Sequence, residues 1–263
     1  MHDLALIFAG FSVGLIVGLT GVGGGSLMTP LLIFGFGFKP YLAIGTDLLF
    51  AAFTKMGGTV SLARQRIVPW RLVGTLSLGS IPACLATLFV LDHLGPADPA
   101  VQKAMTFTLG LALLLTAAAT LYKTIRGKQV ARSISLDDLD AATRPRHWAL
   151  PLLFGAVIGA LVTLTSVGAG AIGVTALMLL YPLLPLPRIV AADIAYAVPL
   201  TLAAGLGHAS LGSVDWPLLG KLLAGSLPGI WLGSQLVHKT PDRIIRSLLS
   251  VLLAYAGVKL VLI

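Results

Sequence analysis

Charged residues are scarce in this chain of 263 residues. They make up 11% of it, against about 25% in ordinary soluble domains. A soluble fold of this length would need more charge to cover its surface, whereas 57% of these residues are hydrophobic. The scarcity argues against a soluble enzyme or binding domain and indicates a surface that mostly faces something other than water.

Other features are also missing. The single cysteine, Cys84, can form no internal disulfide and is interpreted as a buried apolar thiol. The apolar runs do not alternate as barrel strands do. The first three residues lack a basic region, and no small-residue cleavage site ends the first run, so no cleavable signal peptide is expected. Without a nucleotide-binding motif, an ATP-driven pump is not expected, and we predict neither a cofactor nor a metal site.

The chain does contain long apolar segments. A helix that spans a bilayer needs about 20 mainly apolar residues. We therefore predict an all-α polytopic membrane protein, in which the second and seventh segments are too short to span without their neighbours. The ten segments are residues 4–20, 27–38, 41–62, 70–91, 101–122, 148–166, 172–184, 189–209, 217–237 and 244–262.

The positions of the basic residues explain the net charge of +8. Such a charge can indicate nucleic-acid binding, but here the basic residues gather in short loops. Arg64, Arg66 and Arg71 surround one loop, and six others lie in the polar loop 123–147. This pattern is typical of the cytoplasmic loops of membrane proteins. We expect a lipid bilayer around the chain, a cytoplasmic loop 123–147 and no nucleic-acid partner.

The sequence repeats itself in two halves, residues 1–122 and 148–263. Residues 20–25 resemble residues 165–170, and residues 72–82 resemble residues 218–228. From Asp47 to Pro82 the offset between the halves stays at 146 residues. Five segments per half predict opposite orientations in the membrane, the common plan of secondary transporters. A duplicated structural bundle is the alternative.

Each half carries a glycine-rich run between an apolar segment and a short one. Glycine destabilises a continuous helix, so we predict a helix break near the membrane midplane in each half. The helix that follows each break exposes N–H groups and a positive dipole end, which suit an anion. Close helix packing is the alternative, whereas a dinucleotide fingerprint lacks its βαβ unit. The predicted substrate-binding residues are Thr20, Gly23, Gly24, Gly25, Ser26 and Thr29, with Thr165, Ser166, Gly168 and Gly170 opposite.

Three ionisable residues lie inside the predicted spans. Asp47 and Asp193 occupy equivalent positions, and intramembrane carboxylates are functional candidates. They could couple a proton, or they could cap or anchor their helices near the interface. Lys55 could add positive charge to the substrate site or pack against a re-entrant backbone. His208, at the end of a span, is interpreted as a surface histidine, with proton transfer as the less favoured alternative.

The glycine runs, the segment Gly45 to Asp47 and the paired segments ending at Pro82 and Pro228 resemble the sulfite exporter TauE/SafE family, also called the 4-toluene sulfonate uptake permeases. The resemblance implies a transporter, not an enzyme, in a bacterial inner membrane. It implies small sulfur-containing or organic anions such as sulfite, sulfonates or sulfoacetate as substrates. We expect alternating access, with proton coupling as an option and the oligomeric state open. A passive anion channel, or an intramembrane aspartyl protease using Asp47 and Asp193, is the alternative.

Overall fold

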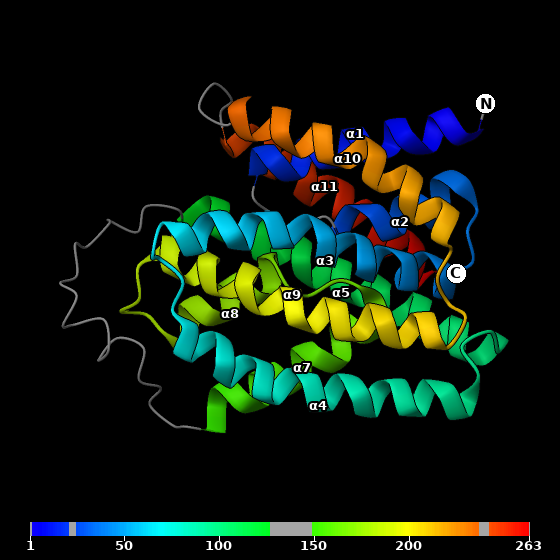
Figure 1. The fold of residues 1–263 in the computed structure, drawn as a ribbon, viewed down its shortest axis with the longest axis horizontal. Helices are drawn as coiled ribbons and strands as arrows, with labels where there is room; N and C mark the ends of the chain where they lie inside the picture. The colour runs from blue at the N-terminus through cyan, green and yellow to red at the C-terminus, as the bar shows by residue number, and fades with distance from the viewer. Residues whose placement is uncertain (1, 21–24, 127–148, 237–241, 263) are drawn as a thin grey trace.

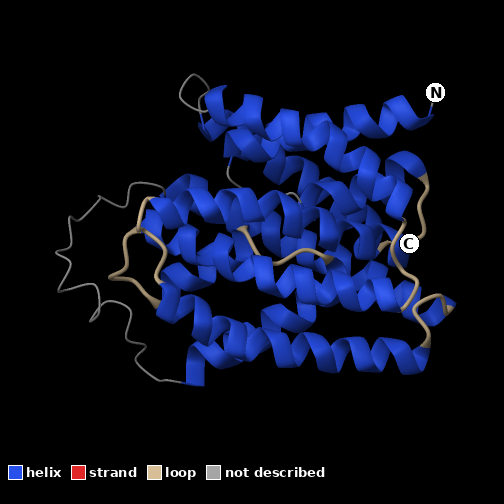
Figure 2. Ribbon diagram, viewed as in Figure 1, coloured by secondary structure: helices blue, strands red, loops and turns tan. Residues whose placement is uncertain are grey.

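The computed structural model describes residues 2–20, 25–126, 149–236 and 242–262. These residues form ten helices and no strand (Figures 1 and 2). The prediction of an all-α fold is confirmed, since each predicted apolar segment corresponds to a helix. The helices are α1 (His2–Thr20), α2 (Gly25–Phe36), α3 (Pro40–Arg64), α4 (Trp70–Leu94), α5 (Pro99–Arg126), α7 (Ala149–Thr165), α8 (Ala171–Leu180), α9 (Leu186–Ser210), α10 (Trp216–Leu236) and α11 (Asp242–Val261).

Helices α2 and α8 are too short to cross a bilayer alone, as predicted. They have 12 and 10 residues, and at 1.5 Å per residue they reach only about 15–18 Å of a core about 30 Å thick. Among the described residues, three helices are long and apolar enough to span by length and composition: Trp70–Leu94, Pro99–Tyr122 and Leu186–Ser210. The apolar exterior agrees with a membrane setting, since Leu4, Phe8 and Leu78 are each at least 70% exposed.

Glycines let two helix pairs approach very closely. A Cβ on Gly10 or Gly14 of α1 would lie 2.4 or 2.5 Å from a carbonyl oxygen of α10. The α4–α7 pair repeats this packing at Gly155 and Gly159, where a Cβ would lie 2.4 or 2.3 Å from a carbonyl oxygen of α4. Small residues at this spacing allow backbones to meet in membranes. The partner carbonyls belong, in the same order, to Leu222, Ser226, Leu76 and Ser80. Leu222 corresponds to Leu76, and Ser226 to Ser80, at the offset between the two halves.

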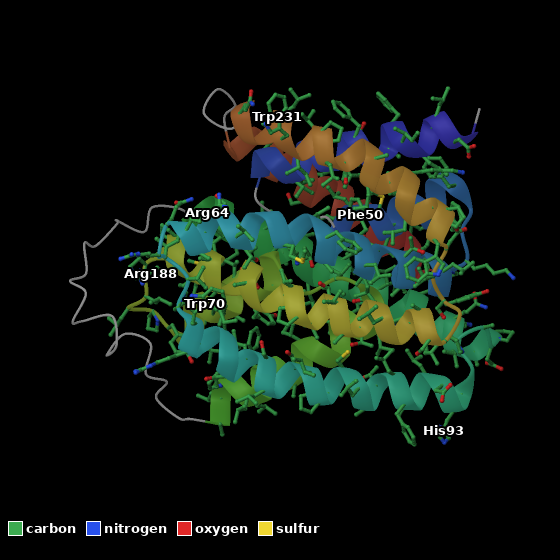
Figure 3. The ribbon with its side chains drawn as sticks, viewed as in Figure 1. Phe50, Arg64, Trp70, His93, Arg188 and Trp231 are labelled. Carbon is green, nitrogen blue, oxygen red and sulfur yellow. The ribbon has the colours of Figure 1, made fainter. Side chains whose placement is uncertain are left out.

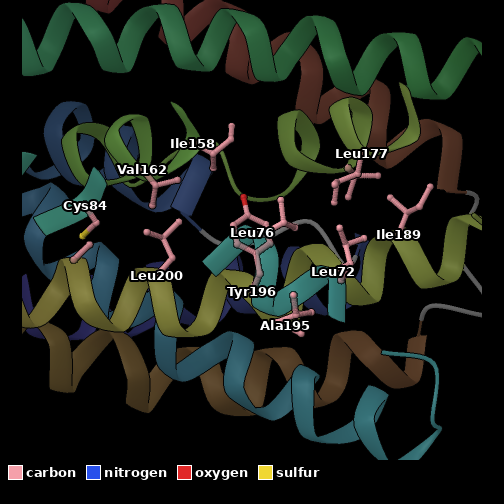
Figure 4. Packing of buried hydrophobic residues seen from close by; sticks show 14 of the residues in the cluster. Leu72, Leu76, Cys84, Ile158, Val162, Leu177, Ile189, Ala195, Tyr196 and Leu200 are labelled. Carbon is pink, nitrogen blue, oxygen red and sulfur yellow. The ribbon is translucent and has the colours of Figure 1, made fainter. Parts of the chain in front are cut away.

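Helices α3 and α9 pack against each other at the centre (Figure 1). α3 is buried almost continuously from Ala43 to Lys55. Figure 4 shows part of the core beside α9, where Tyr196 and Leu200 lie among side chains of α4, α7 and α8. Residues in the middle of these two helices are therefore shielded from lipid and water, so a charged residue there must find partners inside the protein.

Charge divides the molecule into two ends. Arg64, Trp70 and Arg188 lie at one end and His93 at the other (Figure 3). The first end also carries Arg66 and Arg71, and α11 begins there at Asp242. At the other end, Asp98 and Asp215 lie in the loops that precede α5 and α10. The end that holds the arginines is also the end from which the segment 127–148 leaves α5.

Candidate functional site

The second helix break is present. α7 ends at Thr165 and α8 begins at Ala171. Ser166, Gly168 and Gly170 have φ values of 59°, 137° and 133°, a region that favours glycine. The chain therefore leaves the helix where sequence analysis placed the break. In the first half, α1 ends at Thr20 and α2 begins at Gly25, while Gly23 and Gly24 lie outside the described residues.

Thr165 holds the second break together. Its hydroxyl accepts a hydrogen bond from the Val167 N–H at 3.1 Å and lies 2.6 Å from the Leu161 carbonyl, to which it can donate. Within α8, the N–H groups of Gly173 and Val174 donate to the carbonyls of Gly168 and Gly170. The Val174 bond is the first ordinary bond of the helix, whereas the Gly173 N–H is one of the donors that a helix start normally leaves free, so a ligand meets one fewer free N–H group here.

Asp47 lies between the two halves. Its carboxylate is fully buried and accepts a hydrogen bond from the Thr29 hydroxyl of α2. Ser166, from the break in the other half, faces the same carboxylate. Asp47 does not cap α3, which begins seven residues earlier at Pro40 after an N-cap without a side-chain hydrogen bond. The structure thus brings together three of the predicted site residues, Thr29, Asp47 and Ser166.

Asp193 has a different surrounding. It is 1% exposed, and a Cβ added to Gly173 would lie 1.9 Å from its Oδ1 atom. Gly173 therefore lets the α9 carboxylate lie directly on the backbone of α8. The buried Tyr196, one turn along α9, interacts electrostatically with this carboxylate. Sequence analysis missed both residues, although Tyr196 stands three positions after Asp193 on one helix face.

Lys55 connects the two aspartates with the second break. Its side chain is 8% exposed, and its Nζ donates a hydrogen bond of 3.3 Å to the carbonyl oxygen of Ala169. Both Asp47 and Asp193 interact electrostatically with this ammonium group. The contact with Ala169 matches the expectation that Lys55 packs against a re-entrant backbone. An ammonium has three donors, and the described residues accept from one.

The interpretation of His208 as a surface residue is wrong. Its side chain is 0% exposed, and its Nε2 lies 2.9 Å from the carbonyl oxygen of Thr163. The residue ends α9, but the loop that follows folds back over it, and the Ser213 N–H donates to the His208 carbonyl. The position of His208 near the end of a predicted span gave no sign that the following loop would cover it.

A cavity of about 340 Å³ lies away from these charged groups. It is formed mainly by α4 and α5, with Leu164 from α7, and none of its lining residues is charged. An apolar wall suits a hydrocarbon chain better than a small anion. The candidate site is therefore the buried cluster of Thr29, Asp47, Lys55, Ser166 and Asp193.

Comparison with known proteins bears on what this cluster does. The model of the sulfite exporter TauE/SafE family matches residues 6–260, a range that includes both breaks and both aspartates. The chain belongs to the TauE/SafE family. It is 37% identical to the probable membrane transporter protein YjnA of Bacillus subtilis (strain 168), over 98% of this chain and all of that protein.

Two further TauE/SafE relatives come from the same organism. The probable membrane transporter proteins YdhB and YunE are each 26% identical to the chain, and each match covers at least 98% of both proteins. No solved structure matches the chain. The family and these names place this TauE/SafE protein among membrane transporters.

Proposed function

We propose that this TauE/SafE protein is a secondary transporter that moves a small sulfur-containing or organic anion across the inner membrane by alternating access. The anion would bind between the two helix breaks. Thr20, Gly23, Gly24, Gly25, Ser26 and Thr29 would contribute from the first half, and Thr165, Ser166, Gly168 and Gly170 from the second.

The position of Lys55 carries this proposal. Its ammonium lies in the protein interior, at the carbonyl of the second break, with donors left over for a ligand. A buried ammonium attracts an anion strongly, because the low dielectric there screens the attraction little. Sulfonate and carboxylate oxygens accept such charge-assisted hydrogen bonds. The Ser166 hydroxyl, on the same break, offers a further donor.

The packing of the helices supports an inverted repeat of residues 1–122 and 148–263. α3 packs on α9 and α5 packs on α11, and each of these pairs joins equivalent helices of the two halves. α1 packs on α10 and α7 packs on α4, and exchanging the two halves converts one of these two pairs into the other. In Figure 1, α3 runs toward the arginine-rich end and α9 runs away from it. Two such halves could tilt about the central α3–α9 pair and open the site to either side. The loop 123–147 would lie in the cytoplasm.

Flux into liposomes tests the function. Purified protein should take up radiolabelled sulfoacetate or sulfite in a saturable way, and unlabelled anion inside the liposomes should accelerate the uptake. Flux that rises linearly with concentration and shows no counterflow would favour the passive channel. Absence of flux for sulfonates, sulfite and small carboxylates alike would refute the anion assignment.

A further inference from the structure

Several buried oxygen atoms lack a hydrogen-bond partner of good geometry among the described residues, and they include Asp47 Oδ1, Ser166 Oγ and Asp193 Oδ1. Asp47 is 0% exposed and Ser166 is 6% exposed, and the serine faces the carboxylate. The other carboxylate oxygen of Asp47, Oδ2, already accepts a hydrogen bond from the Thr29 hydroxyl. A buried polar atom without a partner costs about 1–3 kcal/mol. Two such atoms facing each other can share one hydrogen bond, which is donated either by the serine hydroxyl to a carboxylate or by a protonated carboxyl group to the serine oxygen.

The buried charges also do not balance. Among the described residues, the buried side chains with a formal charge are Asp47, Lys55 and Asp193. Two carboxylates and one ammonium leave one net negative charge. An anion with one negative charge would double it and a dianion would triple it, and two like charges about 4 Å apart repel by about 4 kcal/mol at an effective dielectric constant of 20. The anion therefore needs a positive companion.

We propose that this companion is a proton bound to Asp47 Oδ1, whose O–H then donates to Ser166 Oγ. The inference rests on the proposed transport function. One proton from solution converts the carboxylate to a neutral carboxylic acid, and the Ser166 hydroxyl accepts from this acid while its own O–H stays available for the anion. Thr29 continues to donate to Oδ2. The buried charge falls to zero before the anion arrives, and Lys55 then faces the anion.

Asp193 is not suited to this role. The Ser166 hydroxyl that faces Asp47 comes from the break in the other half, and the residue that corresponds to Ser166 in the first half is Gly21, which has no hydroxyl. Asp193 Oδ1 also lies against the backbone at Gly173, where even a Cβ does not fit. The two halves therefore differ in chemistry: serine and threonine hydroxyls face Asp47, whereas Asp193 lies against the backbone of α8 and near Tyr196.

The other ionisable groups near Asp47 are few. Lys55 interacts with it from the same helix, and Asp193 acts on Lys55 from α9. His208 of α9 and Asp215 before α10 contact α3 at Gly45 and Thr46, the residues just before Asp47. His208 is the imidazole among these groups, so the variant His208→Gln controls for its contribution.

Infrared difference spectroscopy of the ligand-free protein between acidic and alkaline pH tests the proton site. The wild type should show the C=O stretch of a carboxylic acid, and Asp47→Asn should remove it. Ser166→Ala should shift this band, because the hydrogen-bond acceptor is gone, while Asp193→Asn and His208→Gln keep it. A wild type without the band, or a band that only Asp193→Asn removes, would overturn the inference.

Anion binding gives a second, separate test. At a pH alkaline enough that the ligand-free wild type shows no carboxylic-acid band, calorimetry of sulfoacetate binding in buffers of different ionisation enthalpy should show uptake of about one proton per anion. Asp47→Asn, which imitates the neutral acid, should bind without proton uptake. Binding without proton uptake in the wild type, or binding that requires Na⁺ instead, refutes the proton while the transport proposal stands. If no anion binds at any pH, the transport proposal fails, and the infrared result still decides the proton site.

Discussion

Lys55 has no counterpart in the other half of the chain. The equivalent position is Thr201, whose hydroxyl donates to the carbonyl of Ala197 on its own helix at 2.7 Å. The candidate site between the two similar halves therefore contains one lysine, and the halves differ in charge at this position. Its three N–H donors exceed what the described residues accept, which is the property expected of a ligand-binding group.

The variant Lys55→Met should weaken sulfoacetate binding by about 10- to 100-fold, because a charge-assisted hydrogen bond contributes about 1.5–3 kcal/mol. Binding can be measured by calorimetry or by the thermal shift that the ligand causes. Lys221→Met is the matched control, since Lys221 pairs with Asp3 and is 34% exposed. Equal affinity in wild type and Lys55→Met would show that the anion does not meet this ammonium.

The contact of Asp193 with Gly173 leads to a prediction about stability. In Gly173→Ala the new methyl group would lie 1.9 Å from Asp193 Oδ1, so the carboxylate or the helix must shift. Overpacking of this kind costs about 1–3 kcal/mol. Thermal unfolding in detergent should show a lower midpoint for this variant. Gly74→Ala, at an exposed helical position with no atom within 4 Å of the new carbon, should be neutral or stabilising.

The sequence predicts some of these residues better than others. Asp47 and Asp193 could be found because a carboxylate inside an apolar run is costly and because the repeat pairs them. Gly173 could not be found, since its role depends on which residue of α9 lies against it after folding. The contact of Lys55 with Ala169 joins residues 114 positions apart, and no local pattern encodes such a distance.

At the scale of helices, the packing glycines are the feature that sequence analysis missed. The sequence predicted a role for the glycine runs at the two breaks. It predicted none for the glycines at intervals of four in the first and sixth apolar segments, which pack against other helices. Their partners lie on α10 and α4, far away in sequence, so only the fold shows what they touch. Helix existence and length, by contrast, follow from hydrophobicity alone, and the ten segments were predicted correctly.

Gly14→Ala and Gly159→Ala should destabilise the protein to a similar extent. Each added Cβ would lie 2.5 or 2.3 Å from a carbonyl oxygen, that of Ser226 or Ser80, so each forces a closely packed helix pair apart. We expect a loss of about 1–3 kcal/mol for each, measured by thermal or denaturant unfolding in the same detergent. Gly220→Ala, where the new carbon meets nothing within 4 Å, is the control. A large loss for one variant alone would contradict equivalent interfaces.

For the whole molecule, the distribution of charge sets the orientation. One end carries Arg64, Arg66, Arg71 and Arg188, which outnumber the acidic residue Asp242 at the start of α11. Positive loops remain in the cytoplasm, so we expect this end inside and the end with Asp98 and Asp215 outside. The exposed Trp70 and Trp216 begin α4 and α10 at opposite ends, where tryptophan anchors helices at the interface.

Cysteine labelling in intact cells tests the orientation and the inversion together. Gln65 and Ser210 are exposed residues at the ends of α3 and α9, which are equivalent helices of the two halves. A membrane-impermeant maleimide should label Ser210→Cys from outside and should label Gln65→Cys only after the membrane is opened. The wild type is the control, because its Cys84 is 0% exposed and should stay unlabelled. In parallel repeats the ends of α3 and α9 would lie on one side, so labelling of both variants from one side would refute the inverted arrangement. Labelling with the sides exchanged would keep the inversion and place loop 123–147 outside, contrary to the rule for positive loops.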